Sequence, residues 1–208
     1  MVIKTKIEHL AKKYSAELSK QIQCRTEEME GDDNSHYLIY KVLGITSEEG
    51  CLIDLYQNKG RFLYKYAGSF LEEACILCFK EKYENARSKV KIQNTIGQKP
   101  KTFEIDCLIN NEAIEIKWRD ATTDGDHITK EHTRVKTIRQ AGFTPIRVMF
   151  YYPNRTQAMR IQDTLKTLYI GSQGEYYCGD EAWEFVKNKT DIDLKGILES
   201  LANENKKE

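Results

Sequence analysis

Residues 103–120 have the sequence FEIDCLINNEAIEIKWRD, in which two alternating segments flank a pair of asparagines. Apolar and charged side chains alternate on both sides of this pair, and such alternation is typical of half-buried β-strands. Asparagine tolerates the positive φ angles that a two-residue turn requires. The stretch therefore predicts a β-hairpin whose turn is Asn110-Asn111.

The turn decides which side chains oppose each other, because side chains alternate between the two faces of a strand. The face expected to cover the core carries the opposed pairs Ile109–Glu112, Cys107–Ile114, Ile105–Ile116 and Phe103–Trp118. The other face carries Leu108–Ala113, Asp106–Glu115 and Glu104–Lys117. Opposed Cβ atoms lie roughly 4.5–5.5 Å apart, so the carboxylates of Asp106 and Glu115 would repel each other.

A shared proton, the Lys117 ammonium or a bound metal ion would relieve this repulsion. Two carboxylates at this spacing suit Mg²⁺, a hard cation that prefers oxygen ligands. A metal ion held beside a cation suits phosphodiester hydrolysis, because the metal ion activates a water and clamps the phosphoryl oxygens. An amphipathic hairpin with a solvated, salt-bridged face would contain the same residues, so the spacing alone leaves both interpretations open.

Asp106 followed by Glu115-Ile116-Lys117 resembles the PD-(D/E)xK nuclease superfamily, in particular the type II restriction endonucleases. The stretch EIKWRDATTDGDHITKEHTR, residues 115–134, is similar to the ApaLI-like group. The resemblance covers about residues 66–152, although Ile105 stands where the superfamily motif has proline. It implies that Asp106, Glu115 and the Ile116 carbonyl bind a catalytic Mg²⁺, and that Lys117 assists the attacking water.

A further acidic residue is expected on the helix that precedes the hairpin. Residues 68–72 have the sequence GSFLE, which fits the G-x-x-x-E pattern of many superfamily members. The resemblance implies that Glu72 reaches the metal ion directly or through a water. Glu73 is the competing candidate, and either residue could instead be an ordinary charge on a helix surface.

The segment after the hairpin is the candidate DNA-binding region. A loop and the start of a helix could contact base edges in a groove, through Arg119, Asp120, Thr122, Thr123, Asp124 and His127. Lys130 and Arg134 on the following helix suit phosphate contacts, which position a protein without specifying sequence. The loop residues could equally be turn formers.

The remaining patterns predict an α/β fold. Helices are expected over residues 4–23, 36–44, 66–84, 128–141, 154–169, 180–188 and 191–202, strands over 89–95 and 144–152, and an acidic loop over 27–35. The resemblance implies a restriction-endonuclease-like α/β/α core with a central mixed β-sheet flanked by helices. We expect one endonuclease domain over residues 1–208, with a catalytic core at about 66–152 and accessory terminal helices that bind DNA or dimerise.

Charge and composition bear on the partners. The formal net charge is zero, but residues 80–101 and 128–160 each contain seven basic side chains and at most two acidic ones, which suits phosphate binding. We expect a type II restriction endonuclease with double-stranded DNA as substrate and a cognate DNA methyltransferase as functional partner. The alternatives are another nuclease of the superfamily, such as a junction resolvase or a repair nicking enzyme, and a DNA-binding module without catalysis. A homodimer would cut both strands of a palindromic site, with Trp183, Phe185 and Val186 at its interface or in the core. No long apolar run is present, which predicts a cytoplasmic protein without a membrane partner.

Six cysteines are present, and two of them, Cys75 and Cys78, have the CxxC spacing of zinc and redox sites. They fall inside a predicted helix, with no second pair nearby. We therefore favour buried, reduced thiols over a zinc site or a redox pair.

Overall fold

The computed structural model describes residues 2–97, 99–119 and 125–204, without the side chains of residues 125–127. The chain divides into two compact units: a sheet unit made of Met1–Ile7 and Leu71–Glu208, and a helical unit made of Glu8–Phe70. The expectation of one domain over the whole chain stays a prediction. No described helix combines the length and the apolar character that a bilayer span requires.

The sheet unit contains one five-stranded mixed sheet in the order β1-β2-β3-β4-β5. The strands are β1 (Arg87–Gln93), β2 (Thr102–Ile109), β3 (Glu112–Arg119), β4 (Thr144–Tyr151) and β5 (Glu175–Cys178). The pairs β1–β2 and β2–β3 are antiparallel, whereas β3–β4 and β4–β5 are parallel. Each parallel pair needs a crossover, which the helices α4 (Gly125–Gln140) and α5 (Thr156–Gly171) provide.

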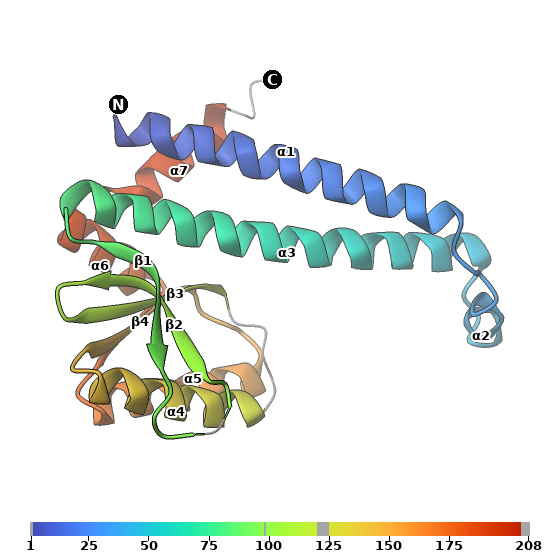
Figure 1. Ribbon diagram of the computed structural model, residues 1–208. Coiled ribbons are helices and arrows are strands. Elements are labelled where there is room, and N and C mark those ends of the chain that lie inside the picture. Colours follow the sequence, from blue (N-terminus) through green and yellow to red (C-terminus); the bar gives the residue numbers. More distant parts are fainter. Residues whose placement is uncertain (1, 98, 120–124, 205–208) are drawn as a thin grey trace. The chain divides into compact units, whose positions relative to one another are not determined.

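Helices cover both faces of this sheet (Figure 1). One face packs against α4 and α5, where Val135 and Leu165 are fully buried with the sheet residue Tyr176. The opposite face packs against α6 (Asp180–Thr190), whose Trp183 ring lies 4.3 Å from that of Phe150. The last turns of α3 (Ser47–Lys82) lie near the same helix, since Phe79 and Phe185 make an edge contact. The helix α7 (Leu194–Glu204) contacts α6. The predicted α/β/α architecture with a mixed sheet is confirmed.

The predicted hairpin forms around Asn110-Asn111, and Asn110 has a positive φ of 52°. Its register agrees with the prediction for three pairs, Cys107–Ile114, Leu108–Ala113 and Ile109–Glu112. In the described strands the β2–β3 ladder ends there, and the Asp106 carboxylate accepts a hydrogen bond of 2.7 Å from the Ile116 amide. The strands therefore separate at Asp106 and Glu115, the residues that the simple register predicts to be directly opposed.

The expected division of the hairpin into two faces is wrong beyond Cys107. One apolar cluster contains Ile105 together with Leu108 and Ala113, which strict alternation places on opposite faces. The β1 residue that would pair with Asp106 is Lys89, which has a φ of 54°. Such a backbone breaks regular pairing, so the alternation is interrupted at the position that carries the first carboxylate.

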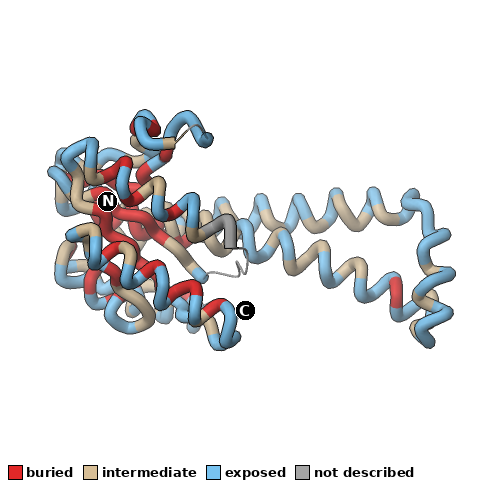
Figure 2. Tube along the Cα trace, turned by 90° about the horizontal axis from the view of Figure 1, so that it is seen from below, coloured by how far each residue is buried: buried red, intermediate tan, exposed pale blue. Residues whose placement is uncertain are grey.

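The helical unit is a helical hairpin in which α1 (Ile3–Glu30) and the first part of α3 run antiparallel, joined by α2 (Tyr37–Val42). Tyr14 makes edge contacts with the rings of Tyr66 and Phe70, which join the two long helices. Its residues are mostly exposed, whereas buried residues concentrate in the sheet unit (Figure 2).

Several sequence predictions need correction. The helix expected over residues 66–84 begins already at Ser47, because glycine does not interrupt it. Gly50 is instead a packing residue: a Cβ there would lie 2.6 Å from the Tyr40 ring. The expected acidic loop over 27–35 is partly helical, since α1 continues to Glu30. The short strand β5 is an addition to the predicted elements.

The C-terminal aromatic residues belong to the core. Trp183, Phe185 and Val186 are at most 8% exposed within the chain, so they are not available as the dimer interface. Cys75, Cys78 and Cys107 are buried free thiols, as expected for core cysteines. Burial raises the pKa of the Cys78 thiol to about 12, so the thiol stays protonated and reacts slowly at neutral pH.

Candidate active site

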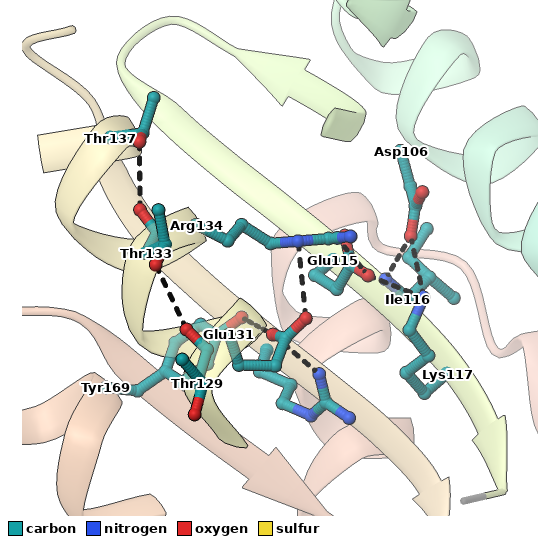
Figure 3. A network of polar contacts seen from close by, with 11 residues as sticks. Asp106, Glu115, Ile116, Lys117, Thr129, Glu131, Thr133, Arg134, Thr137 and Tyr169 are labelled. Atoms are coloured by element: carbon teal, nitrogen blue, oxygen red, sulfur yellow. Dashed lines mark hydrogen bonds and ion pairs between the residues drawn. The ribbon is translucent and has the colours of Figure 1, made fainter. Parts of the chain in front are cut away.

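Asp106, Glu115 and Lys117 come together where β2 and β3 separate (Figure 3). The Lys117 Nζ lies 2.5 Å from Glu115 Oε1 and 3.7 Å from Asp106 Oδ2, so both carboxylates share one ammonium group. Asp106 is 8% exposed and Glu115 is 3% exposed. The two acids thus lie beside one cation, as predicted. They do so because β2 and β3 separate at this point, and they are not a directly opposed pair in the ladder.

The electrostatic environment of the two carboxylates differs. Burial, followed by the nearby Glu115 carboxylate, raises the pKa of Asp106 to about 7, against the opposing effect of Lys117. Burial also acts to raise the pKa of Glu115, but Lys117 and Arg134 outweigh it and the pKa is lowered. Burial acts to lower the pKa of Lys117, and the two acids outweigh that effect, so its pKa is raised. The site therefore favours an ionised Glu115 and a charged Lys117, and Asp106 is the acid that takes up a proton more readily.

A cavity of about 330 Å³ opens onto this site. It is lined by Pro100, Thr102, Phe103, Glu104, Glu115, Lys117, Lys130, Glu131 and Arg134. A larger cavity of about 660 Å³ is lined by residues of α5, β5 and α6, and none of the candidate site residues lines it. We identify the site by its charged groups, because cavity size alone carries no chemistry.

A buried ionic network lies behind Glu115, and sequence reasoning missed most of it. Arg134 of α4 forms ion pairs with Glu115 and, at 3.3 Å, with Glu131. Glu131 also pairs at 3.2 Å with Arg147, which is fully buried on β4 beside Glu115. The Tyr169 hydroxyl donates a hydrogen bond of 3.2 Å to the same carboxylate. The sequence does contain one signal of this network: Arg147 stands inside the apolar run TPIRVMF. A charge buried in such a strand requires a partner of opposite charge.

A comparison with known protein families identifies the family of the chain. The family model described as ApaLI-like restriction endonuclease matches residues 1–203. The chain belongs to the ApaLI-like restriction endonuclease family. The resemblance inferred from the hairpin and the segment behind it is therefore confirmed, and the family implies a nuclease that acts on DNA. No curated protein and no solved structure matches the chain.

Glu72 of this ApaLI-like chain lies on α3 within electrostatic reach of the hairpin acids. Burial raises the pKa of the Glu72 carboxyl, the charges of Lys117 and Lys89 oppose the rise, and that of Glu115 adds to it. Among the described residues, however, no three Asp, Glu, His or Cys side chains form a metal-binding group. Asp106 and Glu115 each have an oxygen close to the Lys117 ammonium, at 3.7 Å and 2.5 Å respectively.

The expected DNA-binding residues of the ApaLI-like chain are only partly described. Asp120, Thr122, Thr123 and Asp124 lie outside the described residues, and His127 is described only by its backbone in α4. Arg119 is exposed at the end of β3, with its guanidinium 5.8 Å from the Trp118 ring. Lys130 is exposed on α4 at the wall of the cavity. The Arg134 side chain is only 22% exposed and pairs with two buried acids.

Proposed function

We propose that the chain is a type II restriction endonuclease that hydrolyses phosphodiester bonds at a specific sequence of double-stranded DNA and requires Mg²⁺. The observation that carries the proposal is the pair of buried carboxylates, Asp106 and Glu115, beside one Lys117 ammonium. Glu115 and Lys117 also line a cavity. Membership of the ApaLI-like family supports the same chemistry.

The chemistry of these residues fits a divalent cation. Burial, and after it the repulsion from Glu115, raises the pKa of Asp106. A hard cation with oxygen ligands would stabilise both carboxylates in their ionised form. Asp106, Glu115 and the Ile116 carbonyl would hold the ion, with Glu72 reaching it through a water. When bound, Mg²⁺ supplies an activated water and neutralises charge on the phosphoryl oxygens.

Lys117 has a role that follows from its charge. Its pKa is raised by the two acids, so the ammonium keeps its protons at neutral pH and acts as a hydrogen-bond donor. It can orient the attacking water or stabilise the negative charge that grows on the scissile phosphate. A general-base role would require a neutral amine, which this environment opposes.

We further propose the partners that such an enzyme needs. Arg119, Lys130 and the segment 120–127 would contact DNA, with phosphate contacts from Lys130 and base contacts from the segment. A second copy of the chain would cut the other strand of a palindromic site. A DNA methyltransferase of the same specificity would protect the host DNA.

Incubation of the purified chain with phage DNA tests the proposal. Mg²⁺ is expected to give a fixed set of discrete double-strand fragments, and chelation of the metal ion should abolish them. Asp106→Ala and Lys117→Ala should each remove cleavage while the protein stays folded. Glu112→Gln is a matched control, because this acid on the same strand pairs with Lys189 at 2.6 Å instead of joining the site. Nicking without discrete fragments, or tight DNA binding without cleavage, would refute the proposal.

A further inference from the structure

We propose that Arg134 is a positioning residue that fixes the Glu115 carboxylate for divalent-ion binding, and that Glu131 holds Arg134 in place. This inference rests on the proposed Mg²⁺-dependent nuclease function and deepens it. It replaces the expectation that Arg134 contacts a DNA phosphate.

The guanidinium of Arg134 bridges two carboxylates. Its Nη1 pairs with Glu115 Oε1, and its Nε lies 3.3 Å from Glu131 Oε1. The guanidinium is planar and rigid, so its charge lies between the two carboxylates in a fixed relation. The contact of Nε with Glu131 is an ion pair without hydrogen-bond geometry. The guanidinium carbon also lies 5.6 Å from the centre of the Phe103 ring, which limits its rotation. Figure 3 shows Arg134 extending from α4 toward Glu115.

Glu131 is anchored from its other oxygen. Its Oε2 pairs at 3.2 Å with the Arg147 guanidinium and accepts a hydrogen bond of 3.2 Å from the Tyr169 hydroxyl. The Glu131 side chain is 4% exposed and Arg147 is fully buried. These contacts hold the Glu131 carboxylate, and its Oε1 in turn faces the Arg134 guanidinium.

The local charge supports a positioning role over phosphate binding. Three acids, Asp106, Glu115 and Glu131, and three bases, Lys117, Arg134 and Arg147, form a cluster of balanced formal charge. An arginine that leaves this cluster for a phosphate would leave two buried carboxylates short of a partner, which is costly. Lys130 is exposed on the same helix and can reach a phosphate without that cost.

The orientation of the Glu115 carboxylate decides which of its two oxygens can bind a metal ion. The cations of Lys117 and Arg134 both approach Oε1. A carboxylate offers about four lone-pair sites on two oxygens, so Oε2 retains sites that can face a metal ion. Groups that orient a metal ligand change metal affinity or activity by roughly 10–100-fold when they are removed.

The test compares Arg134→Lys and Glu131→Gln with wild type in three measurements. Calorimetry without DNA gives the affinity for Mn²⁺ or Mg²⁺, steady-state cleavage separates kcat from KM for DNA, and urea unfolding reports the fold. Arg160→Lys on α5 and Glu199→Gln on α7 are matched controls, because both residues lie outside the site on helices that do not line its cavity.

Both variants are expected to weaken metal binding by about tenfold and to lower kcat, with KM for DNA unchanged. A third variant, Arg134→Gln, should lose more metal affinity than Arg134→Lys, because it lacks the charge that pairs with Glu115. A raised KM with unchanged metal affinity would assign Arg134 to a phosphate contact and overturn the proposal. Unchanged values, or loss of the fold in both variants, would also overturn it. If wild type itself fails to cleave with Mg²⁺, the proposed function falls, whereas the calorimetric comparison still decides whether Arg134 positions Glu115.

Discussion

Replacement of Asp106 by asparagine is expected to stabilise the metal-free protein at alkaline pH. The folded environment raises the pKa of Asp106 from an ordinary value of 3.8 to about 7. A raised pKa means that folding favours the protonated acid, so its contribution to stability is full below pH 3.8 and is lost as pH rises toward 7. About three pKa units at about 1.4 kcal/mol each set an upper limit of roughly 4 kcal/mol for that loss.

The side-chain amide introduced by Asp106→Asn cannot ionise, so the variant escapes the loss. The amide oxygen can still accept the hydrogen bond that the carboxylate takes from the Ile116 amide. The attraction to Lys117 across 3.7 Å is already contained in the raised pKa. The new amide N–H groups are themselves buried, which costs part of the gain. The expected net gain at pH 8 is therefore about 1–3 kcal/mol, equivalent to roughly 2–12 °C in Tm for a chain of this size.

Urea unfolding in a chelating buffer measures this gain, at pH 8 and at pH 4. The difference between Asp106→Asn and wild type should be clear at pH 8 and should nearly vanish at pH 4, where wild-type Asp106 is protonated in the folded state. Glu112→Gln should show no comparable pH-dependent gain, because its carboxylate pairs with Lys189. Equal stabilities at pH 8, or the same difference at both pH values, would refute the electrostatic reasoning.

Three further predictions concern the same unit. Arg147→Met removes a fully buried charge from Glu131 and should cost about 3–5 kcal/mol in the free energy of unfolding; a loss under about 1 kcal/mol in urea unfolding would contradict the network. Leu108→Ala in the hairpin core should cost about 2–5 kcal/mol by the same measurement. The cleavage rate at low Mg²⁺ should rise with pH through about 7 as Asp106 loses its proton, with a midpoint that moves to lower pH when Mg²⁺ is increased; a flat profile across neutral pH would contradict it.

Local patterns were sufficient for much of the fold and for the centre of the site. The Asn110-Asn111 turn and the alternation on either side of it fix three ladder pairs of the hairpin. The same register brings Asp106 and Glu115 to the point in the middle of both strands where the β2–β3 ladder ends. What the alternation could not reveal is the positive φ of Lys89 on the neighbouring strand β1, because that distortion depends on a strand pairing formed by a separate segment.

The supporting network depends on contacts between distant segments. Glu131, Arg147 and Tyr169 belong to α4, β4 and α5, and they meet only because parallel pairing sets β4 beside β3. The sequence marks Arg147 as unusual within an apolar strand but does not name its partner. For the same reason Arg134 resembled a surface cation, since a helix period cannot distinguish solvent from a buried acid.

The position of Cys107 gives the molecule a built-in chemical probe. Its buried thiol directly follows Asp106 in β2, and burial raises its pKa to about 12. Only a thiolate reacts readily with alkylating reagents, so Cys107 can be modified only when the strand leaves its place in the sheet. Cys24 and Cys51 are exposed and Cys178 is half-buried, so these three would react first. The labelling rate of Cys107 in a chain that lacks these three would therefore time the transient opening of β2, and bound metal ions should slow it.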